Sequence, residues 1–237
     1  MPKEERTKAL ALHNLYILSK EVKSINEAIL EGRLWEYTGI KARAHPSLWQ
    51  AFRSIEEHVD FLEDGTPLFK NKAIFLFGPP DHKRPEVVRS TNSIIKNIEF
   101  PRGKTRLLIF PEGEVTPFYN SAVYRHLTSG LGNLIEKAQV SFVVAPFGLI
   151  PVEISDVYPF SQYVSTLELT GIVEQTTIEN SLKVINSWQP KRTVLLDDGG
   201  RYTKLLNKLA SGRKNSILLS LTDGDVIVKA VSRLLTQ

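Results

Sequence analysis

The chain has 237 residues, 42% of them hydrophobic and 24% charged, which are ordinary values for a folded globular protein and argue against disorder. It contains no cysteine, which excludes a disulfide, a thiolate metal ligand and a cysteine nucleophile from this chain. The net charge of +4 is compatible with an RNA partner, and the absence of an apolar run of about 20 residues or a signal-peptide core predicts a cytoplasmic protein without membrane contact.

The first part of the chain predicts two amphipathic helical stretches. Apolar residues at three- and four-residue spacing place one stripe on the first of them: Leu12, Leu15, Leu18, Val22, Ile25 and Ile29. Gly32 favours an end to this helix. A second stripe, between Pro46 and Gly65, consists of Leu48, Phe52, Ile55, Val59 and Leu62. Two helices bury two such stripes only by packing on a larger surface, which either the rest of this chain or another polypeptide can supply.

From residue 72 the pattern changes to short apolar runs that alternate with helical stretches. Strands are expected at 73–77, 106–110, 141–145, 193–196 and 217–221, with helices near 85–97, 121–137, 177–188, 202–209 and 223–235. Continuous apolar strands separated by helices are typical of a mostly parallel sheet covered on both faces. We therefore predict a helical segment over 1–71 and a three-layer α/β sandwich over 72–237.

Glycines, prolines and acids follow four of the expected strands. In open α/β sheets ligands bind beyond the carboxyl ends of the strands, so these exits predict a pocket there. The acids available for acid–base chemistry or ligand binding are Glu112, Glu114, Glu153, Asp197 and Asp198. The alternative is that glycine and proline merely form the turns, and that Asp197 and Asp198 cap the next helix.

A basic stripe follows the fourth strand. Arg201, Lys204 and Lys208 fall on one helical face, and Arg213 and Lys214 come soon after. Such a face can contact the phosphates of RNA, although a solvated surface has the same composition. The sequence holds no phosphate-binding loop of the Walker type, no nucleophile elbow and no spacing typical of metal ligands.

Several blocks resemble one family when taken in order. Residues 10–16 (LALHNLY), 25–29 (INEAI), 32–36 (GRLWE) and 43–46 (RAHP) resemble the end of the barrel domain of archaeal tRNA-guanine transglycosylases. The following blocks resemble the central domain of the paralogous archaeosine synthase: 78–79 (GP), 84–89 (RPEVVR), 145–153 (APFGLIPVE), 157–159 (VYP), Tyr163, 170–171 (TG) and 199–202 (GGRY). The chain thus resembles the C-terminal part of a split member of this family.

The resemblance implies a metal site that this chain cannot complete. His13 is similar to the zinc-binding histidine of the family, whose three cysteine ligands lie upstream in the barrel domain. Zinc commonly needs four ligands. Either a separate barrel chain with a Cys-x-Cys-x-x-Cys motif shares zinc with His13, or the site is lost and His13 is an ordinary helix residue; no cofactor is expected within this chain alone.

The central signature of archaeosine synthase is altered here. Its cysteine, lysine and histidine correspond to Glu112, Thr116 and Tyr124, and these side chains cannot perform the same chemistry. The resemblance and the strand exits together imply the following substrate-binding residues: Pro111, Gly113, Thr116, Pro117, Phe118, Ser121, Phe147, Gly148 and Glu153.

These features predict an accessory or non-catalytic subunit in archaeal tRNA 7-deazaguanosine (archaeosine) modification. It would dock on a barrel-type transglycosylase subunit, as a homo- or heterodimer, and contact tRNA. One alternative is a divergent transferase that acts on deazaguanine-modified tRNA with Glu112 and Asp197 as acid and base. The others are a general RNA-binding module and an interaction protein without a ligand.

Overall fold

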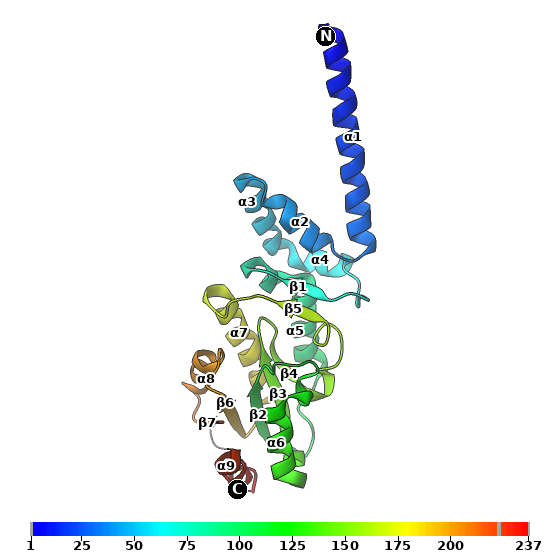
Figure 1. Ribbon diagram of the computed structural model, residues 1–237. Helices are drawn as coiled ribbons and strands as arrows, with labels where there is room; N and C mark the ends of the chain where they lie inside the picture. The colour runs from blue at the N-terminus through cyan, green and yellow to red at the C-terminus, as the bar shows by residue number, and fades with distance from the viewer. Residues whose placement is uncertain (1, 222–223, 237) are drawn as a thin grey trace.

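A long, projecting helix begins the molecule. The computed structural model describes residues 2–221 and 224–236. Helix α1 (Lys3–Leu30) extends away from the rest of the chain (Figure 1). It ends where Gly32 adopts a φ of +67°, a left-handed conformation that glycine accommodates without strain. Within α1, whose residues are all described, Ala28 alone is buried. The predicted first helix is therefore confirmed, and its apolar stripe faces solvent.

Three shorter helices pack at the base of α1. They are α2 (Leu34–Ala42), α3 (Pro46–Ser54) and α4 (Val59–Gly65), with the 3-10 turn η1 (Ile55–His58) between the last two. The second predicted stretch is thus interrupted at η1. Helix α2 was not predicted, because its nine residues show no long apolar periodicity. The ring of Phe52 is buried between Trp35 and Trp49, with centroids 5.1 and 5.5 Å away.

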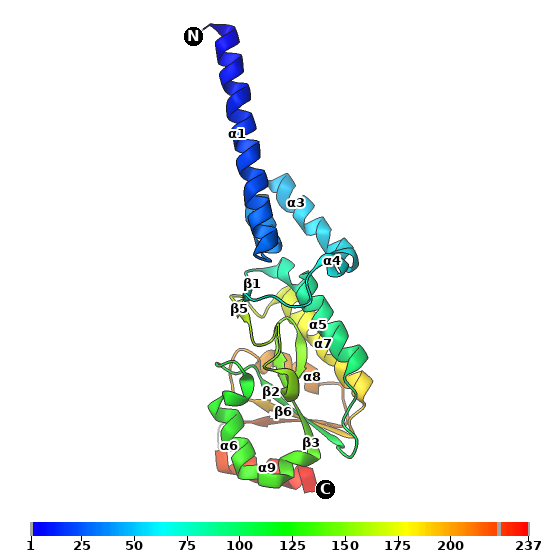
Figure 2. The same ribbon diagram turned by 90° about the vertical axis from the view of Figure 1, so that its right-hand side faces the viewer.

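A five-stranded sheet forms the centre of the second part. Its strands are β2 (Arg106–Pro111), β3 (Ala138–Val144), β4 (Gly148–Pro151), β6 (Arg192–Asp197) and β7 (Ser216–Ser220). Their spatial order is β4-β3-β2-β6-β7, and every neighbouring pair is parallel except β3 with β4. Helices cover both of its faces, as Figure 2 shows. Helices α5 (Pro85–Asn97), α7 (Gly171–Trp188) and α8 (Thr203–Ala210) lie on one side, and α6 (Ala122–Leu131) and α9 (Gly224–Thr236) on the other.

This arrangement confirms the predicted three-layer α/β sandwich with a mostly parallel sheet. The expected helix at 85–97 matches α5, whereas that at 121–137 divides into α6 and the 3-10 segment η4 (Gly132–Lys137). Helix α7 begins earlier than expected. Residue 223, the expected start of the last helix, lies outside the described residues. The division of the chain at residue 72 stays a prediction.

The role expected for the strand at 73–77 was wrong. Strand β1 (Ile74–Leu76) does not join the main sheet; it pairs in parallel with β5 (Tyr163–Ser165) in a separate two-stranded sheet. The edge position beside β3 is taken by β4, which directly follows β3 and runs back along it. Consequently only the ends of β2, β3, β6 and β7 share the carboxyl edge, and the exit after residue 77 lies elsewhere.

Among the residues that the structure describes, no helix has both the length and the apolar character needed to cross a bilayer.

Candidate functional site

A cavity opens at the carboxyl ends of β2 and β6. Its volume of ≈ 740 Å³ lies within the range of about 300–1,000 Å³ that is usual for ligand pockets. The end of β2, the loop after it and the start of α6 form most of its wall. Ser121 caps α6 by accepting a hydrogen bond from the Tyr124 amide at 3.4 Å. The polar residues that line the cavity are Glu112, Glu114, Asn120, Ser121, Arg125 and Asp198.

Both carboxylate oxygens of Glu112 accept hydrogen bonds. The hydroxyl of Tyr163 donates to its Oε1 and the hydroxyl of Tyr202 donates to its Oε2. The guanidinium of Arg201 lies 3.4 Å from Oε2. The amide of Ala145 in turn donates to the Tyr202 hydroxyl at 2.9 Å. Two distant parts of the chain, at Tyr163 and at 201–202, thus converge on one carboxylate, whose side chain is only 16% exposed.

The electrostatics keep all three partners of Glu112 as hydrogen-bond donors. Burial raises the pKa of the Tyr163 hydroxyl, and the nearby Glu112 carboxylate raises it further. The same two causes raise the pKa of Tyr202. Burial acts to lower the pKa of Arg201, but Tyr202 and Glu112 outweigh it and raise that pKa. At neutral pH the carboxylate is therefore held by two neutral phenols and one cation.

Asp197, the expected partner of Glu112 in acid–base chemistry, serves the local backbone instead. Its Oδ1 accepts from the Gly199 amide at 3.0 Å and from the Thr203 hydroxyl at 2.6 Å. It does not line the cavity, whereas Asp198 does. The carboxylate of Asp198 accepts from the Gly200 amide at 2.9 Å. The structure therefore brings Glu112 and Asp198, not Asp197, to the wall of the same cavity.

The expected substrate-binding residues divide into three groups. Pro111, Gly113 and Ser121 line the cavity together with Glu112. Thr116 and Pro117 lie in the loop between β2 and α6, outside the lining. The other four do not line the cavity: Phe118, Phe147, Gly148 and Glu153.

Phe118, Phe147 and Gly148 belong to the core. Both phenylalanines are fully buried, and Phe147 packs edge-on against Phe160 and Tyr163 at 5.3 and 5.6 Å. Gly148 starts β4 and lies against α7. Aromatic and glycine residues at these positions are explained by packing.

Glu153 lies at the opposite edge of the sheet from Glu112. Strand β4 carries the chain back along β3, and Glu153 follows it in η5 (Val152–Ile154). There its Oε2 accepts from Nε2 of Gln139, near the amino end of β3, at 2.7 Å. The expectation that it follows a strand exit at the pocket assumed no antiparallel return and was wrong in this respect.

The predicted basic stripe is paired with acids. Lys204 and Lys208 lie 3.8 and 2.9 Å from the carboxylate of Glu174, a buried residue of α7. Arg201 is engaged with Glu112. Contact of this stripe with RNA stays a prediction, and it requires RNA phosphates to compete with these carboxylates.

His13 does not have the surroundings of a metal ligand. It is exposed on α1, and the described residues contain no group of three His, Cys, Asp or Glu side chains suited to a metal ion. A single imidazole without further ligands does not fit zinc, which commonly needs four. The described residues of this chain therefore do not form a zinc site by themselves.

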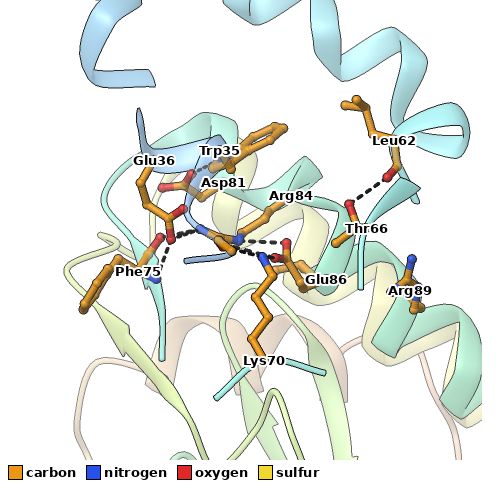
Figure 3. Close-up of polar contacts among 12 residues, drawn as sticks. Trp35, Glu36, Leu62, Thr66, Lys70, Phe75, Asp81, Arg84, Glu86 and Arg89 are labelled. Atoms are coloured by element: carbon orange, nitrogen blue, oxygen red, sulfur yellow. Dashed lines mark hydrogen bonds and ion pairs between the residues drawn. The ribbon is translucent and has the colours of Figure 1, made fainter. Parts of the chain in front are cut away.

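A buried ionic network joins the helical segment to the α/β part (Figure 3). The fully buried guanidinium of Arg84 donates to Glu36 of α2 at 2.6 Å, to Glu86 of α5 at 2.8 Å and to the Phe75 carbonyl of β1 at 3.1 Å. Lys70 donates to the other oxygen of Glu86. Burial acts to raise the pKa of Glu86, but Arg84 and Lys70 outweigh it and lower that pKa.

A second contact reinforces this junction. The indole N–H of Trp35 in α2 donates to Oδ1 of Asp81 at 2.7 Å. The other carboxylate oxygen of Asp81 accepts from the amides of Phe77 and Gly78 at 2.6 and 3.0 Å. The sequence blocks 32–36 and 84–89 thus meet at one place, and their charged residues fix α2 against β1 and α5.

Comparison with known proteins identifies the family of the chain. No protein-family model matches it. The tRNA-guanine(15) transglycosylase of Saccharolobus solfataricus is 34% identical over 188 residues, which are 76% of this chain and 35% of that protein. The tRNA-guanine(15) transglycosylase of Pyrobaculum aerophilum is 37% identical over 164 residues, 68% of this chain and 32% of that protein. The chain belongs to the archaeal tRNA-guanine(15) transglycosylase family. It spans about a third of the length of these relatives.

Among solved structures, the chain is similar to the protein of unknown function AF0587, with a TM-score of 0.47 and 12% identity. The match covers 62% of this chain and 49% of that one. A likeness of this extent carries no argument about function.

Proposed function

We propose that this chain is a non-catalytic subunit in archaeal tRNA 7-deazaguanosine modification, which docks α1 on a barrel-type transglycosylase subunit and contacts tRNA. The exposed apolar stripe of α1 is the observation that carries the proposal. The 28 residues of α1 extend about 42 Å at about 1.5 Å per residue. Leu12, Leu15 and Leu18 are 70, 63 and 61% exposed. A continuous apolar surface of this length marks an interaction site.

The energetics of α1 also support a partner. Full burial of an exposed leucine contributes about 1.5–3 kcal/mol, so a partner that covered the stripe would gain several such contributions. Most helices in proteins depend on tertiary packing of their apolar face. The network around Arg84 holds α2 in place beneath α1, which gives the docking surface a fixed base.

The state of the two expected catalytic acids supports a non-catalytic role. Both oxygens of Glu112 accept from tyrosine hydroxyls, and Asp197 accepts from a backbone amide and from Thr203. A general base needs an oxygen within hydrogen-bond reach of the proton that it removes. These two carboxylates already satisfy local donors, and they do not share the cavity.

Co-expression tests the proposed assembly. The tagged full chain is expressed with the barrel-type transglycosylase of the same organism, and complex formation is measured by affinity capture and light scattering. In a strain that lacks this chain, nucleoside mass spectrometry should show loss of the modified base from tRNA. A Glu112→Gln variant should restore that base if the chain is a scaffold. A chain that stays alone in solution, in a strain whose tRNA is fully modified without it, contradicts the proposal.

We further propose that His13 joins three cysteines of the partner in a shared zinc site. The position of His13 on the exposed helix α1 makes it accessible to a partner chain. Metal analysis of the purified complex should find zinc, and a His13→Ala variant should lower the zinc content of the complex. Equal zinc in both complexes would show that His13 is not a ligand.

The cavity at the end of β2 favours a transferase as the second candidate. A volume of ≈ 740 Å³ is large enough for a small-molecule substrate. In that case the Glu112→Gln variant should fail to restore the modified base although it still forms the complex. The same complementation experiment therefore separates the two functions.

A further inference from the structure

Basic side chains gather at the amino edge of the main sheet, opposite the cavity. Arg102 and Lys104 lie in the loop that leads into β2, and Lys137 immediately precedes β3. The first residues of these strands, Arg106 and Ala138, are neighbours in the sheet. Parallel strands begin at the same edge, so the two loops lie side by side.

The next two strands extend this arrangement. Lys191 immediately precedes β6, and Arg213 and Lys214 lie shortly before β7. The Lys191 amide donates to the Thr105 carbonyl at 2.9 Å, which ties this loop to the loop before β2. We refer to the six residues of these four loops as the amino-edge patch: Arg102, Lys104, Lys137, Lys191, Arg213 and Lys214. The patch crosses three spacings of about 4.8 Å between adjacent strands and is therefore about 14 Å wide.

Most of the patch has no acidic partner. Lys104 lies 4.0 Å from Glu153, and Arg213 donates to the amide oxygen of Asn186. Glu99 and Glu136 lie in the same loops. Within residues 2–221 and 224–236, the other four members form no ion pair with a carboxylate, and all four are exposed: Arg102, Lys137, Lys191 and Lys214. The predicted stripe around Lys208 differs in this respect, because its cations are paired.

Stabilisation of helix ends does not explain most of the patch, in which Lys137 alone lies in the last turn of a helical segment, η4. Cations favour the C-terminal end of a helix, but this effect fades beyond its last turn. Helix α7 ends at Trp188 without a basic residue in its last turn, and Lys191 follows outside the helix. Similarly, α8 ends at Ala210, before Arg213 and Lys214. These cations are therefore available for an external anion.

The chemistry of the four loops points to a phosphate backbone. None of the large apolar side chains that are exposed in the described chain lies in these loops. Binding to a membrane surface ordinarily adds exposed apolar anchors to its cations. Contacts to phosphates need only correctly placed cations and carry no sequence preference.

We propose that the amino-edge patch binds the phosphate backbone of RNA. The proposal rests on the proposed function for the identity of the nucleic acid. It assigns RNA contact to a different surface from the predicted helical face of Arg201, Lys204 and Lys208. In Figure 1 the sheet lies at the other end of the molecule from the start of α1. RNA at the patch and a protein partner on α1 can therefore be held at the same time.

The test measures binding of an unmodified tRNA transcript to the full chain by fluorescence anisotropy between about 50 and 200 mM salt. The first variant combines Arg102→Gln, Lys137→Gln, Lys191→Gln and Lys214→Gln. Each lost phosphate contact lowers the slope of log K against log salt by about 0.9 for a duplex, so four lost contacts lower it by about 3–4. The matched control carries Arg6→Gln, Lys8→Gln, Lys20→Gln and Lys23→Gln on α1, which remove the same charge, and it should keep the slope of the unmodified chain.

Equal slopes for the unmodified chain and the patch variant would overturn the proposal, as would an equal loss in both variants, which would reflect net charge alone. Patch-dependent binding to vesicles containing phosphatidylserine, without patch-dependent binding to RNA, would also overturn it. If the variant with four substitutions melts at a lower temperature than the unmodified chain, a variant with only Lys137→Gln and Lys191→Gln is measured instead. Its slope of log K against log salt should be lower by about 2. Failure of the proposed assembly would appear as loss of co-purification and would leave these slopes unchanged.

Discussion

Replacement of Glu86 by glutamine tests the role of the buried network between α2 and α5. The side chain of Glu86 is 2% exposed and accepts from both Arg84 and Lys70. In the Glu86→Gln variant Arg84 keeps its ion pair with Glu36, whereas Lys70 loses the carboxylate with which it is paired. Breaking a buried ion pair by removal of one partner costs about 3–5 kcal/mol. For a chain of this size each kcal/mol lowers the melting temperature by about 2–4 °C, so a decrease of about 6–20 °C is expected.

The pH dependence provides a second measurement on the same variant. Arg84 and Lys70 outweigh burial and lower the pKa of Glu86 in the folded protein. A carboxylate with a lowered folded-state pKa contributes stability above its unfolded pKa, about 4.3, and this contribution is lost as the pH falls through the folded-state value. The difference in unfolding free energy between the unmodified chain and Glu86→Gln should therefore be complete at pH 7 and decrease in acid.

Urea unfolding followed by tryptophan fluorescence is a suitable assay, because Trp35 contacts Asp81 beside the network. The control is Glu21→Gln, which removes an exposed carboxylate paired with Lys41 and should leave the unfolding curve unchanged. A loss of less than about 1 kcal/mol in Glu86→Gln at pH 7 would refute the reasoning, since it would show that solvent or relaxation replaces the missing charge.

Two further substitutions test the α/β part. Tyr202→Phe removes a hydroxyl that donates to the carboxylate at the end of β2, and it should destabilise the protein by about 1–3 kcal/mol at pH 7. Because the pKa of Tyr202 is raised in the folded state, this contribution is complete below the unfolded pKa of about 10 and is lost as the pH rises through the folded-state value; denaturant titrations at neutral and alkaline pH measure it. Gly148→Ala places a side chain at a φ of +91°, with its Cβ 2.7 Å from that of Asn180, and thermal unfolding should show a loss of at least about 1–3 kcal/mol from backbone strain. An unchanged melting temperature in Gly148→Ala would mean that α7 can move away from β4.

The elements with strong local signals were predictable from the sequence. Helix α5 has proline at its first position and one apolar face, and its bounds agree with the expectation. Helix α1 has a long regular stripe. Strand β4 was missed because a four-residue apolar run next to another strand has no periodicity of its own. The pairing of β1 with β5 depends on contacts between distant residues, and no local pattern specifies them.

The candidate site shows the same division. The rule that ligands bind beyond the carboxyl ends of strands singled out Pro111, Glu112 and Ser121, and these three residues line one cavity; their role in binding stays a prediction. The partners of Glu112 were not predictable, since Tyr163 and Tyr202 lie 51 and 90 positions away along the chain. Both tyrosines belong to the sequence blocks that resemble the family, which was the only available signal.

The positions of the two proposed surfaces lead to a prediction about their independence. The stripe of α1 projects from the helical segment, whereas the amino-edge patch belongs to the main sheet (Figure 1). Substitutions at sites that share no contacts usually have additive effects. A variant with Leu15→Ser and Leu18→Ser should therefore lose the barrel-type partner in affinity capture and keep its binding to tRNA. The fourfold patch variant should keep the partner and lose tRNA. If either variant lost both activities, RNA and the partner would share a surface or bind in an obligatory order, and the assignment of separate surfaces would be wrong.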